Sequence, residues 1–190
     1  AGLIVVDHYG LDRCWERSVK CRARWIITLE DCPNRSHDCD ALIDTSPFSS
    51  RYWNRYRNRT NSDTFLFLGP QFMLVSPKIT ALAQFQRDQR DQSKPNILIS
   101  FGGGDNNNIS QKVLEAIENL GGRNAKYVLL VGPNNKNLNK LAKRAARMPF
   151  VTLLTGITDM VPHLKRATLA IGGMSVSLWE RMFAQIPNIV

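Results

Sequence analysis

The sequence predicts an α/β protein whose strands form doubly wound parallel sheets. In the second half of the chain, short apolar runs alternate with amphipathic segments, a pattern typical of parallel strands joined by helical crossovers. The runs are continuously apolar instead of alternating, as expected for strands buried on both faces. Two of them end in glycine turns that lead directly into helical segments. Such a turn lets backbone N–H groups and a helix N-terminus approach a bound anion.

The first half of the chain contains the irregular part of this pattern. Leu3–Val6 reads as a buried strand, and a helix is expected over Leu11–Arg22, where apolar residues recur at helical spacing. The remaining strands of this half are expected at Trp25–Leu29, Ala41–Ile43 and Phe65–Leu68.

The second half is regular. Its expected strands are Ile97–Phe101, Lys126–Val131, Val151–Leu154, Leu169–Ile171 and Ile186–Val190. The helices expected between them are Ile109–Leu120, Leu138–Arg147, Met160–Arg166 and Ser175–Phe183.

A charged, glutamine-rich segment separates the two halves. Gln84–Lys94 has hardly any apolar residue, so we expect a linker there and a domain boundary near Ser93. The predicted domains are therefore residues 1–92 and 93–190. Because both ends of the sequence lie in apolar runs, we expect both domains to be incomplete and the chain to be a fragment.

Composition limits the partners. The net charge of +9 and the pI near 9.7 favour an anionic ligand. No apolar run reaches the ~18 residues of a membrane span, and four cysteines without a secretory signal indicate reduced thiols in a cytoplasmic protein. The basic, aromatic segment Arg51–Arg59 can be read as a nucleic-acid stacking patch or as a solvated helical face. The second interpretation is favoured, so we expect neither a nucleic-acid partner nor a membrane partner.

The two glycine turns are the candidate ligand site. Asn96–Asn108 and Ile171–Arg181 each place glycines between a strand and a helix, although neither matches a P-loop or a dinucleotide fingerprint. Each is readable as a plain tight turn, but two such turns on neighbouring strands would face one diphosphate. Glu180 then lies one turn into the second helix. There it can accept hydrogen bonds from ribose hydroxyls or form a surface ion pair with Arg181 or Arg166.

Other polar groups are less specific. Asp7, His8 and Tyr9 follow the first strand, where they can orient a sugar or a water molecule or serve only in capping and packing. The group Cys32, His37 and Cys39 lacks the paired spacing of a zinc site, so we expect no metal ion and interpret these cysteines as thiols that pack in a turn.

Several motifs together resemble a known family. They are VDHYGLD from Val6, HDCDALID from His37, LGPQFMLV from Leu68, ISFGGGD from Ile99 and IGGMSVSLWER from Ile171. In this order they resemble the UDP-2,4-diacetamido-2,4,6-trideoxy-β-L-altropyranose hydrolases of pseudaminic acid biosynthesis, which belong to the GT-B glycosyltransferase-like superfamily. The resemblance implies two Rossmann-like domains in a GT-B-like arrangement. Residues 1–92 would be the second half of the sugar-side domain with the linker, and residues 93–190 the UDP-binding domain without its end.

The same resemblance implies a reaction and its residues. Water attacks the anomeric carbon with inversion and releases UDP, with no metal or other cofactor. The matching positions for catalysis are Tyr9 and His8. For UDP they are Gly102, Gly103 and Asp105 near the diphosphate, Asp159 and Met160 beside the base, Gly173, Ser175 and Ser177 at the phosphates, and Glu180 at the ribose.

The chain also departs from this family. The catalytic histidine loop G-x-G-H and a later N-Q motif are absent, and Met174 stands where a small residue is usual. We therefore expect the fragment, a monomer, to bind UDP weakly at best and to be inactive by itself, and the full-length protein to hydrolyse the UDP-sugar. The alternatives are a GT-B glycosyltransferase that uses a UDP-sugar donor and, third, a non-catalytic binding module.

Overall fold

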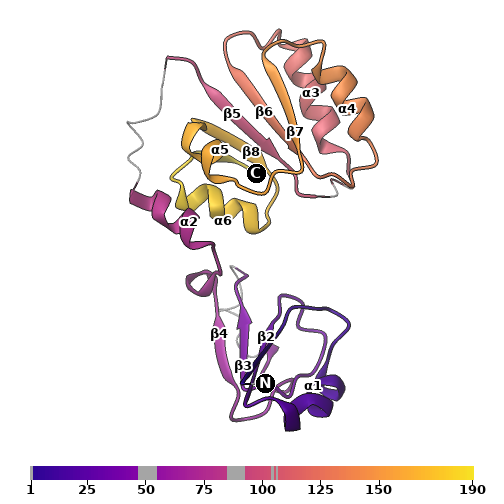
Figure 1. Cartoon of the computed structure of the whole chain (residues 1–190), viewed down its shortest axis with the longest axis vertical. Helices are drawn as coiled ribbons and strands as arrows, with labels where there is room; N and C mark the ends of the chain where they lie inside the picture. Colours follow the sequence, from indigo (N-terminus) through magenta and orange to yellow (C-terminus); the bar gives the residue numbers. More distant parts are fainter. Residues whose placement is uncertain (1, 47–54, 85–92, 104, 106) are drawn as a thin grey trace. The chain divides into compact units, whose positions relative to one another are not determined.

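The computed structural model describes residues 2–46, 55–84, 93–103, 105 and 107–190 (Figure 1). Part of the Arg51–Arg59 segment, most of the expected linker Gln84–Lys94 and Gly104 lie outside the described residues. Contacts divide the chain into a first unit, Ala1–Leu74, and a second unit, Val75–Val190. Among the described residues, no helix is long and apolar enough to cross a membrane.

The first unit is built on a four-stranded parallel sheet with strand order β1-β2-β3-β4. The strands match the sequence prediction within a residue: β1 (Leu3–Val6), β2 (Trp25–Leu29), β3 (Ala41–Asp44) and β4 (Phe65–Leu68). The core gathers around Val6, Ile26 and Leu42, which are at most 3% exposed. Each of these lies on a strand, so the apolar runs define the core as predicted.

The helix between β1 and β2 is shorter than expected. α1 runs over Arg13–Val19 and continues as the 3-10 turn η1 (Lys20–Arg22). Asp12 sets the start, because its side chain accepts a hydrogen bond from the backbone N–H of Cys14 at 2.9 Å. Glu16 lies in the first turn and is fully buried.

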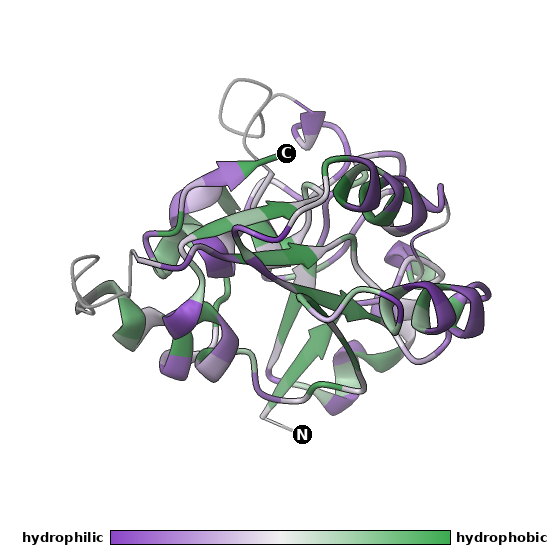
Figure 2. Ribbon diagram, turned by 90° about the horizontal axis from the view of Figure 1, so that it is seen from above, coloured by the Kyte–Doolittle hydropathy of each residue, from purple (hydrophilic) through white to green (hydrophobic). Residues whose placement is uncertain are grey.

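The second unit has a five-stranded parallel sheet with strand order β7-β6-β5-β8-β9. Its strands are β5 (Asn96–Ser100), β6 (Lys126–Val131), β7 (Val151–Thr155), β8 (Leu169–Gly172) and β9 (Asn188–Ile189), and its main helices are α3 (Ile109–Asn119), α4 (Leu138–Ala145), α5 (Val161–Arg166) and α6 (Val176–Phe183). The strands are hydrophobic (green in Figure 2), whereas the helices carry hydrophilic outer surfaces. The expected β-α alternation is confirmed.

Each face of this sheet carries its own core. Leu98 and Leu130 pack with Leu164 of α5 in one cluster, while Ile99 and Leu129 pack with α3 and α4 in the other. Neighbouring residues of one strand thus enter opposite clusters, because side chains alternate across a strand. Both faces are covered, which makes the sheet doubly wound.

The segment before the expected linker packs with the second unit. After η3 (Pro70–Phe72), the chain forms α2 (Pro77–Thr80) and η4 (Ala81–Gln84). Ile79 and Leu82, both at most 5% exposed, enter the same cluster as Leu98 and Leu164. The contact division therefore falls between Leu74 and Val75, before the boundary expected near Ser93.

This assignment is testable by truncating Leu82. We expect Leu82→Ala to reduce the stability of the second unit by about 2–5 kcal/mol, because it leaves a cavity in a closed core. Hydrogen exchange in urea should show faster exchange in β5, β6 and β8. The matched control is Leu74→Ala, whose side chain is 57% exposed and whose loss should stay within about 0.5 kcal/mol. Faster exchange confined to β1–β4 in Leu82→Ala would contradict the assignment.

Candidate functional site

The central strands β5 and β8 of the second sheet meet at a topological switch point. From β5 the chain adds β6 and β7 on one side, and then β8 and β9 on the other. In open parallel sheets, ligands bind outside the carboxyl ends of the strands at such a point. Both glycine turns leave the sheet here, after Ser100 of β5 and after Gly172 of β8, which are paired in register.

The turn after β5 is closed by its own carboxylate. Gly102 and Asp105 have positive φ angles of 80° and 41°. The carboxylate of Asp105 accepts hydrogen bonds from the backbone N–H groups of Ile109 and Ser110, at 2.8 and 2.9 Å. These are first-turn donors of α3, so Asp105 caps the helix that was expected to face a diphosphate. A phosphate near Gly102 and Gly103 must therefore find other donors.

The turn after β8 leads into α6 through Ser175. This residue is the N-cap with extended backbone, and its hydroxyl lies 2.8 Å from the hydroxyl of Ser177. Gly172 has no room for a side chain, because a Cβ there would lie 2.3 Å from the carbonyl oxygen of Ser100 and 2.7 Å from Nη1 of Arg181. The glycine thus allows a guanidinium group to lie directly beneath the turn.

Arg181 is the buried cation of this edge, and sequence reasoning assigned it only to a possible surface pair. It is 1% exposed. Its guanidinium donates to Asn188 Oδ1 at 2.6 Å, to Ser177 Oγ at 3.2 Å and to the carbonyl oxygen of Gly173 at 3.1 Å. All three acceptors are neutral, and no carboxylate forms an ion pair with Arg181 within the described residues.

Burial has opposite effects on the two neighbouring ionisable groups of α6. Burial lowers the pKa of Arg181, and the negative charge of Glu180 partly opposes this shift. Burial raises the pKa of Glu180, and the positive charge of Arg181 partly opposes that shift. The sequence allowed an ion pair between Glu180 and Arg181, and the described residues do not form it. Glu180 is half-buried on α6 and acts on Arg181 through its charge, but within the described residues no carboxylate pairs directly with Arg181 beneath the Gly173 turn.

Asp159 and Met160 begin the crossover from β7 to β8. Asp159 accepts a hydrogen bond from the N–H of Val161 at 3.0 Å, and Met160 packs against the cluster around Leu164. Both contacts are structural, namely a helix cap and core packing. Their expected place beside a nucleotide base stays a prediction.

In the first unit, His8 and Tyr9 follow β1 on the surface. The Tyr9 ring is 68% exposed. Its hydroxyl donates to Oδ1 of Asp31, which follows β2, at 2.9 Å, and this hydrogen bond raises the pKa of Tyr9. His8 Nδ1 accepts a hydrogen bond from the N–H of Gly10 at 2.9 Å, so a neutral His8 carries its proton on Nε2.

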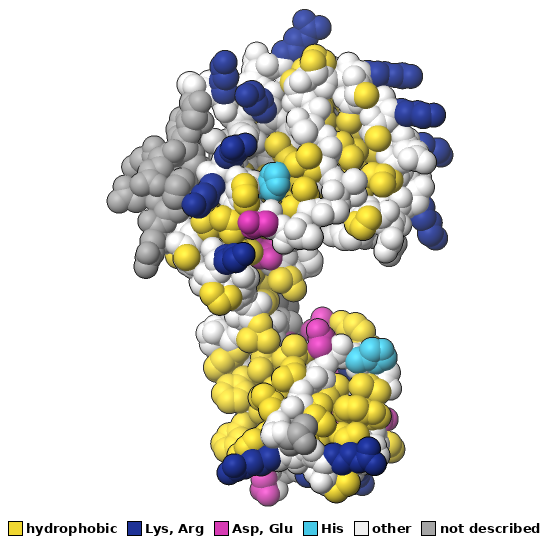
Figure 3. All heavy atoms as spheres, viewed as in Figure 1, with side chains coloured by type: hydrophobic (Ala, Val, Ile, Leu, Met, Phe, Trp, Pro, Cys, Tyr) yellow, Lys and Arg dark blue, Asp and Glu magenta, His cyan; other side chains and the backbone are white. Residues whose placement is uncertain are grey.

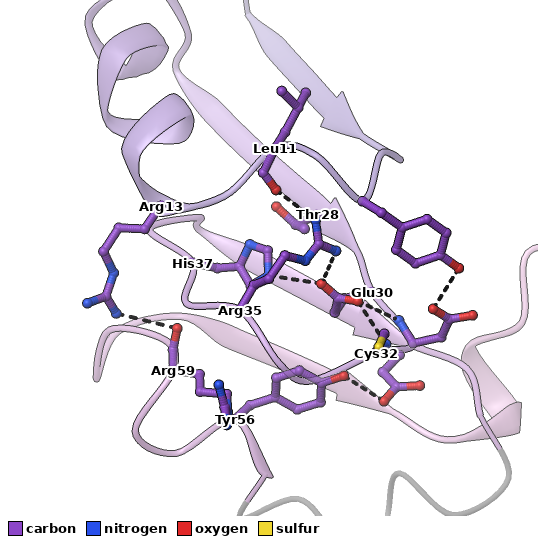
Figure 4. Close-up of polar contacts among 12 residues, drawn as sticks. Leu11, Arg13, Thr28, Glu30, Cys32, Arg35, His37, Tyr56 and Arg59 are labelled. Carbon is purple, nitrogen blue, oxygen red and sulfur yellow. Dashed lines mark hydrogen bonds and ion pairs between the residues drawn. The ribbon is translucent and has the colours of Figure 1, made fainter.

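Beneath this loop lies an array of three buried titratable side chains, Glu16, His37 and Glu30, with the half-buried Arg35 beside them; Figure 4 shows Glu30 with His37 and Arg35. His37 Nδ1 lies 2.8 Å from Glu16 Oε1, and its Nε2 lies 3.0 Å from Glu30 Oε2. Arg35 donates to the same oxygen of Glu30. Because each ring nitrogen of His37 faces a carboxylate oxygen, a proton on both nitrogens satisfies both contacts.

Other donors complete the array. Burial raises the pKa of Glu16, but hydrogen bonds from His37, from the N–H of Asp38 and from the hydroxyl of Thr28 outweigh burial, so the pKa is lowered. His37 was grouped with Cys32 and Cys39 in the sequence, yet its partners are glutamates. The described residues contain no group that could hold a metal ion, and burial raises the pKa of Cys39 to about 12.

A hollow of about 1390 Å³ in the second unit lies away from these loops, at the amino ends of β5, β6 and β7. Basic side chains line it over an apolar floor that includes Val128 and Leu154, and Figure 3 shows Lys and Arg around hydrophobic side chains on this unit. Its single acidic side chain, Glu118, is paired with Arg144. Since ligands of parallel sheets bind at the carboxyl edge, we place the candidate site at the turns.

Comparisons with known proteins show a fold without showing a family. No family model matches the chain. The uncharacterized protein MJ1062 of Methanocaldococcus jannaschii is 23% identical over an alignment of 193 residues, which covers 99% of this chain and 40% of that protein. The spore coat polysaccharide biosynthesis protein SpsG of Bacillus subtilis is 25% identical over 137 residues, which covers 72% of this chain and 40% of that protein. The chain thus spans 40% of the length of each relative.

A solved structure supports the architecture. The crystal structure of TarM superposes with a TM-score of 0.54 over 98% of this chain and 40% of that chain, at 10% sequence identity. The fold is therefore GT-B-like, with two parallel-sheet α/β domains, as predicted. Neither relative's name refers to pseudaminic acid, so the finer resemblance stays a prediction.

The polar network of the first unit predicts acid sensitivity. Asp38, bound by Arg17, Lys20 and Asn61, has a pKa far below its usual range. A carboxyl whose pKa is lower in the folded state adds stability above its unfolded pKa of ~3.9 and loses it as the pH falls further. We expect the free energy of unfolding of the first unit, measured in urea, to fall between pH 5 and pH 2. In Asp38→Asn this fall should be smaller by about 1–2 kcal/mol.

The matched control is Asp63→Asn. Asp63 is exposed and hydrogen-bonds only the neighbouring Ser62 among the described residues. Its variant should keep the wild-type pH dependence. An Asp38→Asn profile identical to that of the control would show that the Arg17 and Lys20 contacts do not act on Asp38 in solution.

Proposed function

We propose that the protein is a glycosyltransferase of the GT-B type that uses a UDP-sugar donor, with the diphosphate bound at the carboxyl edge of β5 and β8. The observation that carries this proposal is Arg181, a buried cation with neutral partners beneath the Gly172–Gly173 turn. Burying a charge without a counter-charge is costly. A bound phosphate would supply that counter-charge.

The surrounding groups suit a nucleoside diphosphate. The hydroxyls of Ser175 and Ser177 stand at the start of α6, where the helix dipole favours an anion. Ser177 also accepts from Arg181, so that, with Ser175 as the donor in the contact between the two hydroxyls, the Ser177 proton can be donated to a phosphate oxygen. Glu180, one turn further along, offers carboxylate oxygens to ribose hydroxyls.

This arrangement serves the chemistry of the leaving group. In sugar transfer, the bond between the anomeric carbon and the diphosphate oxygen breaks, and the departing UDP gains negative charge. Donors and positive charge fixed in advance at that position stabilise the transition state more than the ground state. The proposed role of Arg181 is to place this charge and to hold the turn.

Hydrolysis of the UDP-sugar is the second candidate. The motifs from Val6, His37 and Ile171 resemble the pseudaminic-acid hydrolases, and Tyr9 stands exposed at the end of β1, where it could orient a water molecule. The two candidates share the UDP site and differ only in the attacking group, a water molecule or an acceptor hydroxyl. The name of SpsG, a spore coat polysaccharide biosynthesis protein, favours transfer.

We also propose that the protein acts as a monomer on a free nucleotide sugar, with neither nucleic acid nor a membrane as a partner. Product analysis with UDP-N-acetylglucosamine separates the candidates. Free N-acetylglucosamine indicates hydrolysis, and a sugar joined to an added saccharide acceptor indicates transfer.

The UDP site is tested by titration calorimetry. We expect UDP to bind the chain, and Arg181→Gln to weaken binding at least tenfold, because one charge-assisted contact to phosphate is worth about 1.5–3 kcal/mol. Arg147→Gln is the matched control, since Arg147 is exposed and lines the distant hollow. Circular dichroism checks the fold of each variant. UDP affinity that is equal in wild type, Arg181→Gln and Arg147→Gln would refute the site.

A further inference from the structure

We propose that Arg35 is a positioning residue for Tyr9, fixing the loop after β1 from beneath so that the tyrosine is held ready for the substrate. This inference rests on the proposed use of a UDP-sugar and adds to it that Tyr9, exposed at the end of β1, contacts the sugar or the attacking group. It adds a residue that no sequence motif indicated.

Arg35 contacts the loop directly. One guanidinium nitrogen, Nη1, donates to the carbonyl oxygens of His8 and Leu11, at 3.1 and 3.0 Å. These two acceptors flank Tyr9 in the chain. The guanidinium carbon also lies 5.5 Å from the centroid of the Tyr9 ring, within the range of a cation–π contact. One planar group thus holds the backbone on both sides of Tyr9 and contacts its ring.

Glu30 connects this loop to the next one. Its carboxylate binds Nη2 of Arg35 and also accepts from the N–H groups of Asp31 and Cys32, at 3.1 and 2.8 Å. Asp31 in turn accepts the hydrogen bond of the Tyr9 hydroxyl. The ring and the hydroxyl of Tyr9 are therefore held by two groups, Arg35 and Asp31, that both hydrogen-bond to Glu30.

In the array beneath, acidic and basic side chains alternate. With both ring nitrogens protonated, His37 lies between Glu16 and Glu30, and Arg35 follows, so that two negative and two positive groups alternate. The side chains of Glu16, Glu30 and His37 are 0% exposed, and that of Arg35 is 17% exposed. Such an array holds the Glu30 carboxylate in place, because removal of any member leaves a buried polar group without its partner.

The geometry requires a guanidinium group. Lysine offers a single ammonium centre on a flexible stem, whereas arginine presents donors in a fixed plane. A lysine at this position could retain the charge next to Glu30, but it could not also bind two carbonyl groups and contact the ring. Charge alone is therefore insufficient for the proposed role.

Stability is a weak explanation for this array. Buried ion pairs often contribute no more than apolar packing of the same volume. Here the contacts end at a ring that is 68% exposed, so the array fixes a side chain on the surface without burying it. A fixed, exposed aromatic side chain with an oriented hydroxyl is a feature of ligand binding.

The test compares Arg35→Lys with Arg17→Gln. Arg17 is an arginine of the same unit that pairs with a carboxylate, Asp38, and is 61% exposed, without contact to the loop. The first readout is titration of the Tyr9 hydroxyl by NMR with labelled tyrosine. In Arg35→Lys the pKa of Tyr9 should return toward its ordinary value, because the hydrogen bond to Asp31 that raises it is no longer held. In Arg17→Gln it should stay raised.

The second readout separates turnover from nucleotide binding. Measured on the whole protein with UDP-N-acetylglucosamine, Arg35→Lys should lower kcat at least tenfold while UDP affinity stays within twofold, because the proposed UDP site belongs to the other unit. Free guanidinium at low millimolar concentration should partly restore turnover in Arg35→Ala. If the Arg35 variants fail to fold, Asp31→Ala replaces them, since Asp31 is exposed and its loss should give the same drop in kcat.

The outcomes separate the two proposals. Unchanged Tyr9 titration and unchanged kcat in Arg35→Lys would overturn the positioning role and leave the UDP site intact. Absence of UDP binding and turnover in the wild type would overturn the proposed function, while the Tyr9 titration alone would still decide whether Arg35 positions Tyr9.

Discussion

The carboxylate of Glu30 is the contact on which the binding edge of the first unit depends. It accepts hydrogen bonds from Arg35, from His37 and from two backbone N–H groups of the loop after β2. A buried carboxylate is tolerated only when its oxygens are saturated with donors. Here the donors come from separate segments of the chain, so the ionised group requires these segments to lie together. The exposed positions of Tyr9 and Asp31 follow from that requirement.

The second unit uses a buried cation in a different way. Arg181 also anchors a loop at the carboxyl edge of a parallel sheet, but its acceptors are an amide, a hydroxyl and a carbonyl. Within the described residues no acidic side chain forms an ion pair with it, although the neighbouring Glu180 acts on it through its charge. The two anchors therefore differ in their electrostatic consequence. The array in the first unit contains both acidic and basic partners in direct contact, whereas the guanidinium beneath the turn after β8 lacks a paired carboxylate and suits a bound anion.

The GT-B-like fold alone does not define a reaction. The similarity to TarM, at 10% identity, shows a fold with two α/β domains, and one fold supports different chemistries. The functional argument rests instead on the positions of Arg181, Ser177 and Glu180 at the switch point. Asp105 shows why side-chain positions matter, because a loop that resembles a phosphate turn already has its helix donors bound to its own carboxylate.

The sequence by itself determined the order of strands and helices, the doubly wound sheet and the loops at its binding edge. Apolar runs and helical spacing are local patterns, and they depend on nearest neighbours along the chain. Only the tertiary structure decided which charged residues are buried. Glu16 and His37 are 21 positions apart, and Arg181 lies beneath Gly172, which contacts β5. The tertiary structure alone also shows that Ile79 and Leu82 pack with the second unit. Burial of a charge depends on partners that folding brings from distant segments, and no local pattern records those partners.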